Sequence, residues 1–168
     1  MELKIHPNDK MTPVERAKAI AEKRDYDRIM MDPFLGEIKA RLIGKNTREY
    51  WRNEDSLVMG DIVSMNRFGL DGMGVGTCKK SSVDNEMDID ETCEFFADSK
   101  MIAGNVAPVY TICNGTQGNI EDEVKRCILA GKKCKKGFML TPGCNLPLAT
   151  ADEKIDMFLN AGRKYSFI

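Results

Sequence analysis

The second half of the chain alternates short apolar segments with amphipathic helical patterns, and this alternation constrains the fold more than any other feature. Apolar segments of strand length lie at 101–106 and 137–141. Helical patterns follow them at about 120–130 and 151–164, with apolar residues at three- and four-residue spacing. Strands that alternate with helices pair in parallel through right-handed crossovers. The sequence therefore predicts an α/β fold.

The first half of the chain has mostly helical patterns. Thr12 is a favoured helix cap, and Pro13 suits the first helical position. Because Glu15 completes a capping box with Thr12, a helix is predicted to start here. The apolar residues 28–32 end at Pro33 and indicate a short strand or an extended segment. Further helices are predicted at about 35–43, 47–52, 55–68 and 90–97, and further strands at 71–76 and 87–89.

The predicted strands bring several loops together. In parallel α/β folds, the loops that follow the carboxyl ends of the strands form the active site. We therefore expect residues 76–82, 105–108 and 142–147 to share one functional face. The polar stretch 79–90 differs in composition from its surroundings and is predicted to be a linker or junction.

Composition and charge exclude several classes of protein. With 25 basic and 26 acidic residues, the chain lacks the basic excess of a nucleic-acid-binding protein. No apolar run approaches the ~20 residues of a membrane span, and the N-terminus lacks the apolar stretch of a signal peptide. The sequence thus predicts a cytoplasmic protein without nucleic-acid or membrane partners, whose six cysteines are reduced thiols. Its 168 residues match one domain.

One cysteine has a distinctive setting. Cys144 lies in the segment 141–147, at the predicted carboxyl end of a strand. Prolines on both sides stiffen this loop, and Gly143 permits an unusual backbone angle. A thiol held in this way suits a metal ligand or a nucleophile, and the alternative is a small structural residue. Cys127, by contrast, lies on the apolar face of the 120–130 helix and is predicted to belong to the core.

Other chemical signatures are sparse. His6 is the only histidine, which argues against a Ser-His-Asp hydrolase or a polyhistidine metal site. The cysteines form no CxxC pair. Gly72, Gly74 and Gly76 are not followed by the third glycine of a dinucleotide-binding pattern. These glycines are better explained by a close approach of backbone or ligand.

A set of short motifs in a fixed order resembles one known family. The set comprises Thr12-Pro13-x-Glu15-Arg16, Asp27-Arg28, Arg67-Phe68-Gly69-Leu70-Asp71-Gly72, Ala103-Gly104-Asn105-Val106-x-Pro108-Val109, Asn114-Gly115-Thr116, Glu123-Val124-Lys125-Arg126-Cys127-Ile128 and Gly137-Phe138-Met139-Leu140-Thr141-Pro142-Gly143-Cys144 with Pro147. Together they look like the uroporphyrinogen decarboxylase superfamily, on its methylcobamide:thiol (coenzyme M) methyltransferase branch.

The resemblance implies a particular fold. Members of this superfamily are (β/α)8 barrels of about twice this length. The chain would then be a single truncated domain over 1–168, a half-barrel with N-terminal helices. Its N-terminal part would cover 1–78 and its C-terminal part 85–168, with the middle of the barrel missing between them. The first barrel strand would lie near 71–76 and the sixth near 86–89.

The resemblance also implies a site. In the methyltransferase branch, an H-x-C pair and a late cysteine hold zinc, and Cys144 matches the late cysteine. Asn105 and Gly143 fall at positions implied to contact a cofactor. Zinc would lower the pKa of a thiol substrate, and the resulting thiolate would take a methyl group from a methylated corrinoid. The H-x-C pair has no counterpart here, because the only histidine is His6.

The missing H-x-C ligands determine how tightly we expect the chain to bind zinc. The isolated chain is predicted to bind zinc weakly or not at all. Should zinc bind, the replacement ligands to test are Cys78, Cys113, Asp71 and Asp88, with Cys78 first.

The resulting functional hypothesis is a relative of corrinoid-dependent methyltransferases that has little or no activity alone. One alternative is a non-catalytic accessory or binding subunit. A second is a porphyrinogen decarboxylase-like lyase, although the arginine-rich N-terminal motif of those enzymes is absent. A homodimer, or a complementary chain, would complete the barrel, and a corrinoid protein is a further expected partner. The opposing hypothesis is a monomer whose N-terminal helices cover the open face.

Overall fold

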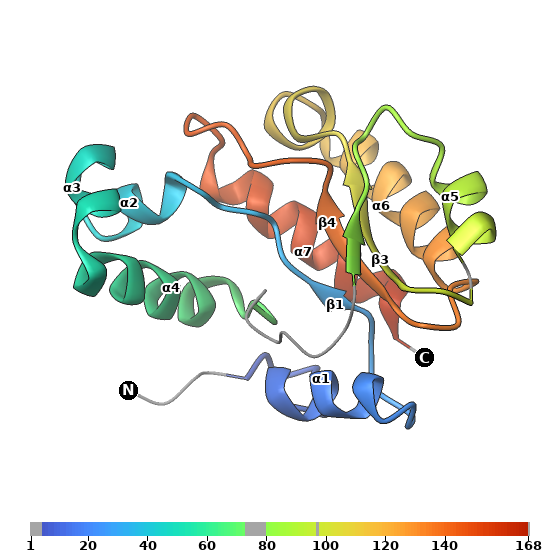
Figure 1. Ribbon diagram of the computed structural model, residues 1–168. Coiled ribbons are helices and arrows are strands. Elements are labelled where there is room, and N and C mark those ends of the chain that lie inside the picture. The colour runs from blue at the N-terminus through green and yellow to red at the C-terminus, as the bar shows by residue number, and fades with distance from the viewer. Residues whose placement is uncertain (1–4, 73–79, 97, 168) are drawn as a thin grey trace.

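The computed structural model describes residues 5–72, 80–96 and 98–167 (Figure 1). In chain order its elements are α1 (Pro13–Ala21), β1 (Met30–Met31), α2 (Ile38–Leu42), α3 (Thr47–Arg52), α4 (Glu54–Phe68), β2 (Lys80–Ser82), α5 (Ile89–Phe96), β3 (Met101–Val106), the π-helix η1 (Pro108–Cys113), α6 (Gln117–Gly131), β4 (Phe138–Pro142) and α7 (Asp152–Ser166). No helix in the described ranges is long and apolar enough to cross a bilayer.

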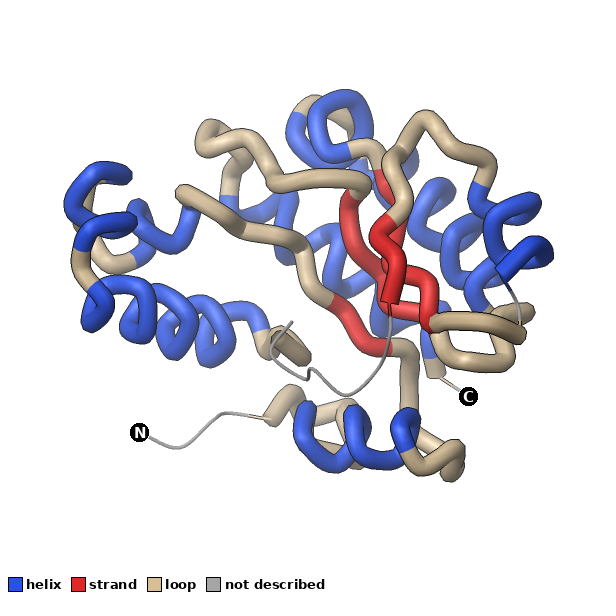
Figure 2. The backbone as a smooth tube through the Cα atoms, viewed as in Figure 1, coloured by secondary structure: helices blue, strands red, loops and turns tan. Residues whose placement is uncertain are grey.

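The four strands form one parallel sheet in the order β1-β4-β3-β2 (Figure 2). β3 and β4 are the central pair, with Ala103 opposite Met139, and β1 and β2 flank them. After α4 the chain returns to the outer side of β1, where the backbone N–H of Asp71 donates to the carbonyl of Met31 at 3.2 Å. The predicted α/β class with parallel strands is therefore confirmed.

One face of the sheet packs against α5, α6 and α7, which Figure 1 shows beside and behind the strands. Ile120, Val124, Cys127 and Ile128 of α6 are all fully buried in this core. The prediction that Cys127 is a core residue is confirmed. Burial in this cluster supplies the main free energy that holds the helices on the strands.

Residues of the other sheet face meet α1. Because side chains alternate along a strand, Met101 and Ala103 of β3 point away from the side that carries Ile102. They form a second buried cluster with Met30, Met139 and Ala17 of α1. The N-terminal helix thus covers this part of the sheet face, and the apolar residues there are not left in contact with water.

Several helix starts follow from local capping. In α1, Thr12 Oγ1 accepts from Glu15 N at 3.2 Å, and Glu15 Oε2 accepts from Thr12 N at 2.8 Å, so the predicted capping box is confirmed. The side chains of Asn46 and Asn53 cap α3 and α4 by accepting from the backbone N–H groups of Glu49 and Ser56. Gly69 then ends α4 with a φ of 63°, a conformation that glycine adopts without strain.

One strand prediction and one linker prediction in the middle of the chain are wrong. Residues 87–89 do not form a strand, because Asp88 Oδ1 accepts from Glu91 N at 3.0 Å and begins helix α5. The strand beside β3 is instead β2, inside the stretch predicted to be a linker.

The first strand of the sheet lies within residues 28–32, which are predicted as a short strand or an extended segment, and not at 71–76, where the resemblance places the first barrel strand. It is β1, which pairs with β4, and residues 71–72 belong to no strand. The remainder of the predicted 71–76 strand lies outside the described residues.

Candidate functional site

The loops after all four strands converge at the carboxyl edge of the sheet. Leu146 N, after β4, donates to the carbonyl of Phe34, after β1, at 3.1 Å. Gly143 N donates to the carbonyl of Val106, at the end of β3, at 3.0 Å. A Cβ atom on Gly143 would lie only 2.5 Å from the backbone nitrogen of Asn85, which follows β2. Residues 105–108 and 142–147 therefore share one face, as predicted, together with residues after β2. Of the predicted 76–82, residues 76–79 lie outside the described residues and 80–82 form β2 itself.

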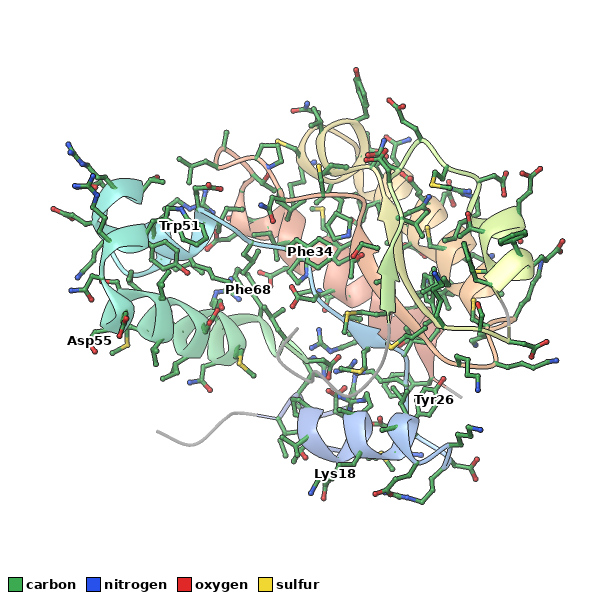
Figure 3. All side chains as sticks on the ribbon, in the orientation of Figure 1. Lys18, Tyr26, Phe34, Trp51, Asp55 and Phe68 are labelled. Atoms are coloured by element: carbon green, nitrogen blue, oxygen red, sulfur yellow. The ribbon has the colours of Figure 1, made fainter. Side chains whose placement is uncertain are left out.

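A cleft of about 490 Å³ opens beside this edge. Figure 3 labels the two aromatic residues that line it, Phe34 after β1 and Trp51 on α3. Asp32 and Asp61 contribute carboxylates, and Asn145 contributes an amide from the loop after β4. The cleft thus combines apolar walls with a few polar groups, as small-molecule sites do.

Cys144 lies next to this cleft on the loop after β4, as predicted. Its side chain is exposed, and its sulfur lies 3.7 Å from the carbonyl oxygen of Asn145. Within the described ranges, no group of three His, Cys, Asp or Glu side chains is placed to hold a metal ion. Zinc sites need three or four such ligands. The residues around Cys144 therefore do not fit zinc by themselves, and its role as a ligand stays a prediction.

Asn105 and Gly143 hold the edge of the sheet together. The Asn105 side chain is fully buried, and its Nδ2 donates to the carbonyls of Asp84 at 3.0 Å and Met87 at 2.8 Å. Its Oδ1 lies 3.4 Å from the Cys127 thiol, which donates to it. Gly143 is needed for the close approach to residue 85, and it has no positive φ, so the expected unusual backbone angle is wrong. Cofactor contact by either residue stays a prediction.

The candidate replacement ligands do not gather around Cys144. Asp88 caps α5, and Cys113 is half-buried at the end of η1. Asp71 is buried and accepts from two arginines and a backbone N–H, so its oxygens already have donors. Cys78 lies outside the described residues.

A buried cluster of charges joins three motifs that are far apart in sequence. Arg16 of α1 and Arg28 before β1 have no exposed surface, and both donate to Asp71. Arg16 Nε also donates to Asp27 at 2.7 Å, and Arg28 Nη2 to Asp9 at 2.6 Å. This cluster was missed in the sequence, although each of its two arginines stands in a motif that carries the family resemblance.

The pKa values within the cluster favour the charged forms. Burial raises the pKa of Asp27, but hydrogen bonds from Arg16 and from the N–H groups of Lys10 and Met11 outweigh burial and lower it to about 2. Burial likewise opposes the charge of Arg28, yet Asp9 and Asp71 hold its pKa above the ordinary value. The cluster is therefore a set of mutually stabilising ions that fixes the N-terminal segment against β1.

The comparison with protein families agrees with the family resemblance seen in the sequence. The family model described as uroporphyrinogen decarboxylase (URO-D) matches residues 75–165. Among solved structures, a methyltransferase from Methanosarcina mazei matches with a TM-score of 0.46 and 19% identity. The alignment covers 91% of this chain and 46% of that one, so the chain spans less than half the length of this solved structure. No curated protein matches. Because the family model covers more than half of its residues, the chain belongs to the uroporphyrinogen decarboxylase family.

Proposed function

We propose that the chain is a partial family member from the branch that transfers a methyl group from methylcobamide to a thiol, and that it acts only once its barrel is completed. The single observation that carries the proposal is the exposed Cys144 thiol at the carboxyl edge of a parallel sheet, beside a cleft. This edge is where parallel α/β folds carry their active sites.

The strand order supports the incomplete barrel. In a closed eight-stranded barrel, the eighth strand pairs with the first, so the first, eighth, seventh and sixth strands are neighbours. The order β1-β4-β3-β2 is the arc that these four strands would form, with the outer side of β2 as one open end. We propose that a second copy of the chain supplies the remaining arc, because four strands from each copy are the number that closes such a barrel.

The open edge at β2 favours pairing with a specific partner over non-specific aggregation. β2 has only three residues, Lys80–Ser82, all polar in sequence. Short, polar edge strands resist aggregation. A partner must therefore match this edge closely, as a second copy related by two-fold symmetry would.

A non-catalytic accessory subunit is the second candidate. It is favoured by the absence, among the described residues, of any group of side chains that could hold a metal ion. Under the catalytic proposal, the complementary half of the barrel would have to supply the metal ligands that the methyltransferase branch requires. A non-catalytic accessory subunit would need no such ligands.

The experiment that separates the two measures methylation of a small thiol with methylcobalamin as donor and zinc supplied, over a range of protein concentrations. The catalytic proposal predicts a rate per chain that rises with association and is lost in Cys144→Ser. Cys113→Ser, which changes a half-buried thiol on η1, is the matched control and should retain the rate. A rate indistinguishable from the uncatalysed reaction at every concentration would contradict the proposal and favour the accessory subunit.

A further inference from the structure

A second pocket, of about 370 Å³, lies at the opposite end of the strands from Cys144. It is formed where three segments meet: the end of α1, the start of β3 at Met101, and Gly137 just before β4. Because the strands are parallel, these starts share the amino edge of the sheet. The pocket is therefore separate from the candidate functional site.

The residues that line this pocket are strongly basic. Its lining contains five cationic side chains and no carboxylate: Lys23, Arg24, Lys100, Lys135 and Lys136. They come from all three segments, so the fold gathers charges that the sequence keeps apart.

Only two of these cations have an acidic partner in the described part of the chain. Arg24 pairs with Glu22 at 2.7 Å, and Lys135 with Asp98 at 3.0 Å, and both pairs are exposed. Lys100 Nζ lies over the ring of Phe96, 4.3 Å from its centre. Three positive charges therefore remain unbalanced around a concave surface, where the walls concentrate their field.

Besides the cations, the lining has an apolar part and a phenol. The apolar part, which we call the floor, consists of Ile20, Ala21 and Met101. The half-buried Tyr26, labelled in Figure 3 near α1, adds a phenol. Burial raises the pKa of Tyr26, so its hydroxyl stays protonated at neutral pH. Ser99 also lines the pocket, with its hydroxyl donating to the carbonyl of Phe96 at 3.2 Å.

We propose that this pocket binds a small organic diphosphate, with two linked phosphates among the lysines and the organic part on the apolar floor. One phosphate group carries about −1.5 to −2 at neutral pH, which is too little to balance three cations. Two linked phosphates match that charge, and lysine ammonium groups bind phosphate as point charges from several directions. The inference is independent of the proposed methyl transfer.

Cys134 offers a local reporter of occupancy. It lines the pocket between Lys133 and Lys135, and its thiol contacts that of Cys93 on α5. The hydrogen bond from Cys93 lowers the pKa of Cys134, whereas burial of the thiol, which is 6% exposed, opposes the charged form. A ligand in the pocket should slow alkylation of this cysteine.

The test uses isothermal titration calorimetry to measure the affinity of the full chain for inorganic pyrophosphate, adenosine diphosphate and orthophosphate. The diphosphates should bind at least tenfold more tightly than orthophosphate, and more weakly as salt is raised. Lys100→Gln and Lys136→Gln should each weaken binding by about threefold or more. Lys132→Gln removes a charge from the same lysine run but outside the pocket, and is the matched control.

A second measurement locates the ligand. Iodoacetamide labelling of Cys134, followed by peptide mass spectrometry, should slow when pyrophosphate is present. Tighter binding of adenosine diphosphate than of pyrophosphate would show that the organic part of the ligand binds to the floor. Equal binding would show that only the two phosphates are recognised. No binding of either diphosphate, equal weakening in Lys132→Gln, or unchanged labelling of Cys134 would overturn the proposal.

Discussion

At the scale of single residues, the charges of the N-terminal segment hold distant parts of the chain together. Asp71, which follows α4, accepts from Arg16 of α1, from Arg28 and from the backbone of Met31. Ions buried in this way contribute little net stability as a set, but removing one member leaves its buried partners with one counter-ion fewer. The cluster therefore fixes which segments meet, and its loss should be costly.

Replacing Asp71 with asparagine should strongly destabilise the chain. The change leaves Arg16 and Arg28 buried with one anion fewer, for which we expect a loss of about 3–5 kcal/mol in the free energy of unfolding. Urea denaturation followed by circular dichroism measures it. Asp156→Asn, which breaks only the exposed pair with Arg67 at 2.9 Å, is the control and should cost at most about 1 kcal/mol. Equal losses in both variants would contradict the role of the cluster.

Asp27 makes stability depend on pH in the acid range. Its pKa falls from 3.8 in the unfolded chain to about 2 in the folded one, so the folded state favours the ionised form. This contribution is fully present well above pH 4 and is lost as the pH falls toward 2. Urea midpoints between pH 5 and pH 2.5 should fall less steeply in Asp27→Asn than in the original chain. If the urea midpoints of the two chains fall equally with pH, Asp27 is not the group that makes stability depend on pH.

At the scale of elements, local signals predicted the helices better than the strands. The capping box at Thr12 and the apolar spacing of α6 depend on neighbours in sequence, and both were predicted. β2 was missed because its residues are polar and its only strand-like property is pairing with β3. The predicted strand at 87–89 failed because a capping aspartate outweighs three residues of alternating polarity.

The packing of the loops at the carboxyl edge depends on Gly143. In Gly143→Ala, the new Cβ would lie 2.5 Å from the Asn85 backbone nitrogen, so the loop after β2 must move. We expect a loss of about 1–3 kcal/mol in thermal or urea unfolding. Gly118→Ala, in the first turn of α6, is the control, because its Cβ would meet nothing closer than 3.8 Å. It should be neutral or stabilising by up to about 1 kcal/mol. A neutral Gly143→Ala would show that the two loops are not in close contact.

The two sites differ in how far the sequence could predict them. The loop position of Cys144 follows from a strand and two prolines that are adjacent in sequence, so it was predicted. The basic pocket at the amino edge was not, because Lys23, Lys100 and Lys136 meet only through the fold. The burial of Asn105 was also not predicted, since its partners belong to the turn after β2.

At the scale of the whole molecule, the chain is a parallel arc with the candidate functional site at its carboxyl edge and an open end at β2. β1, β4, β3 and β2 are neighbours, and α1 covers the second face near Met30 and Met139. Within the described residues, the outer side of β2 has no strand beside it. Completion of the barrel is thus the central claim on which the proposed methyl transfer depends.

The most direct test is light scattering behind a sizing column, with the purified chain at micromolar concentration. One chain has a mass of 18.9 kDa, and the account predicts a particle of two chains that dissociates on dilution. Replacing Ser82 with proline at the edge of β2 should shift this equilibrium toward single chains, because proline cannot donate to a neighbouring strand. A stable particle of 18.9 kDa at micromolar concentration, with no partner bound, would contradict completion of the barrel by a second copy.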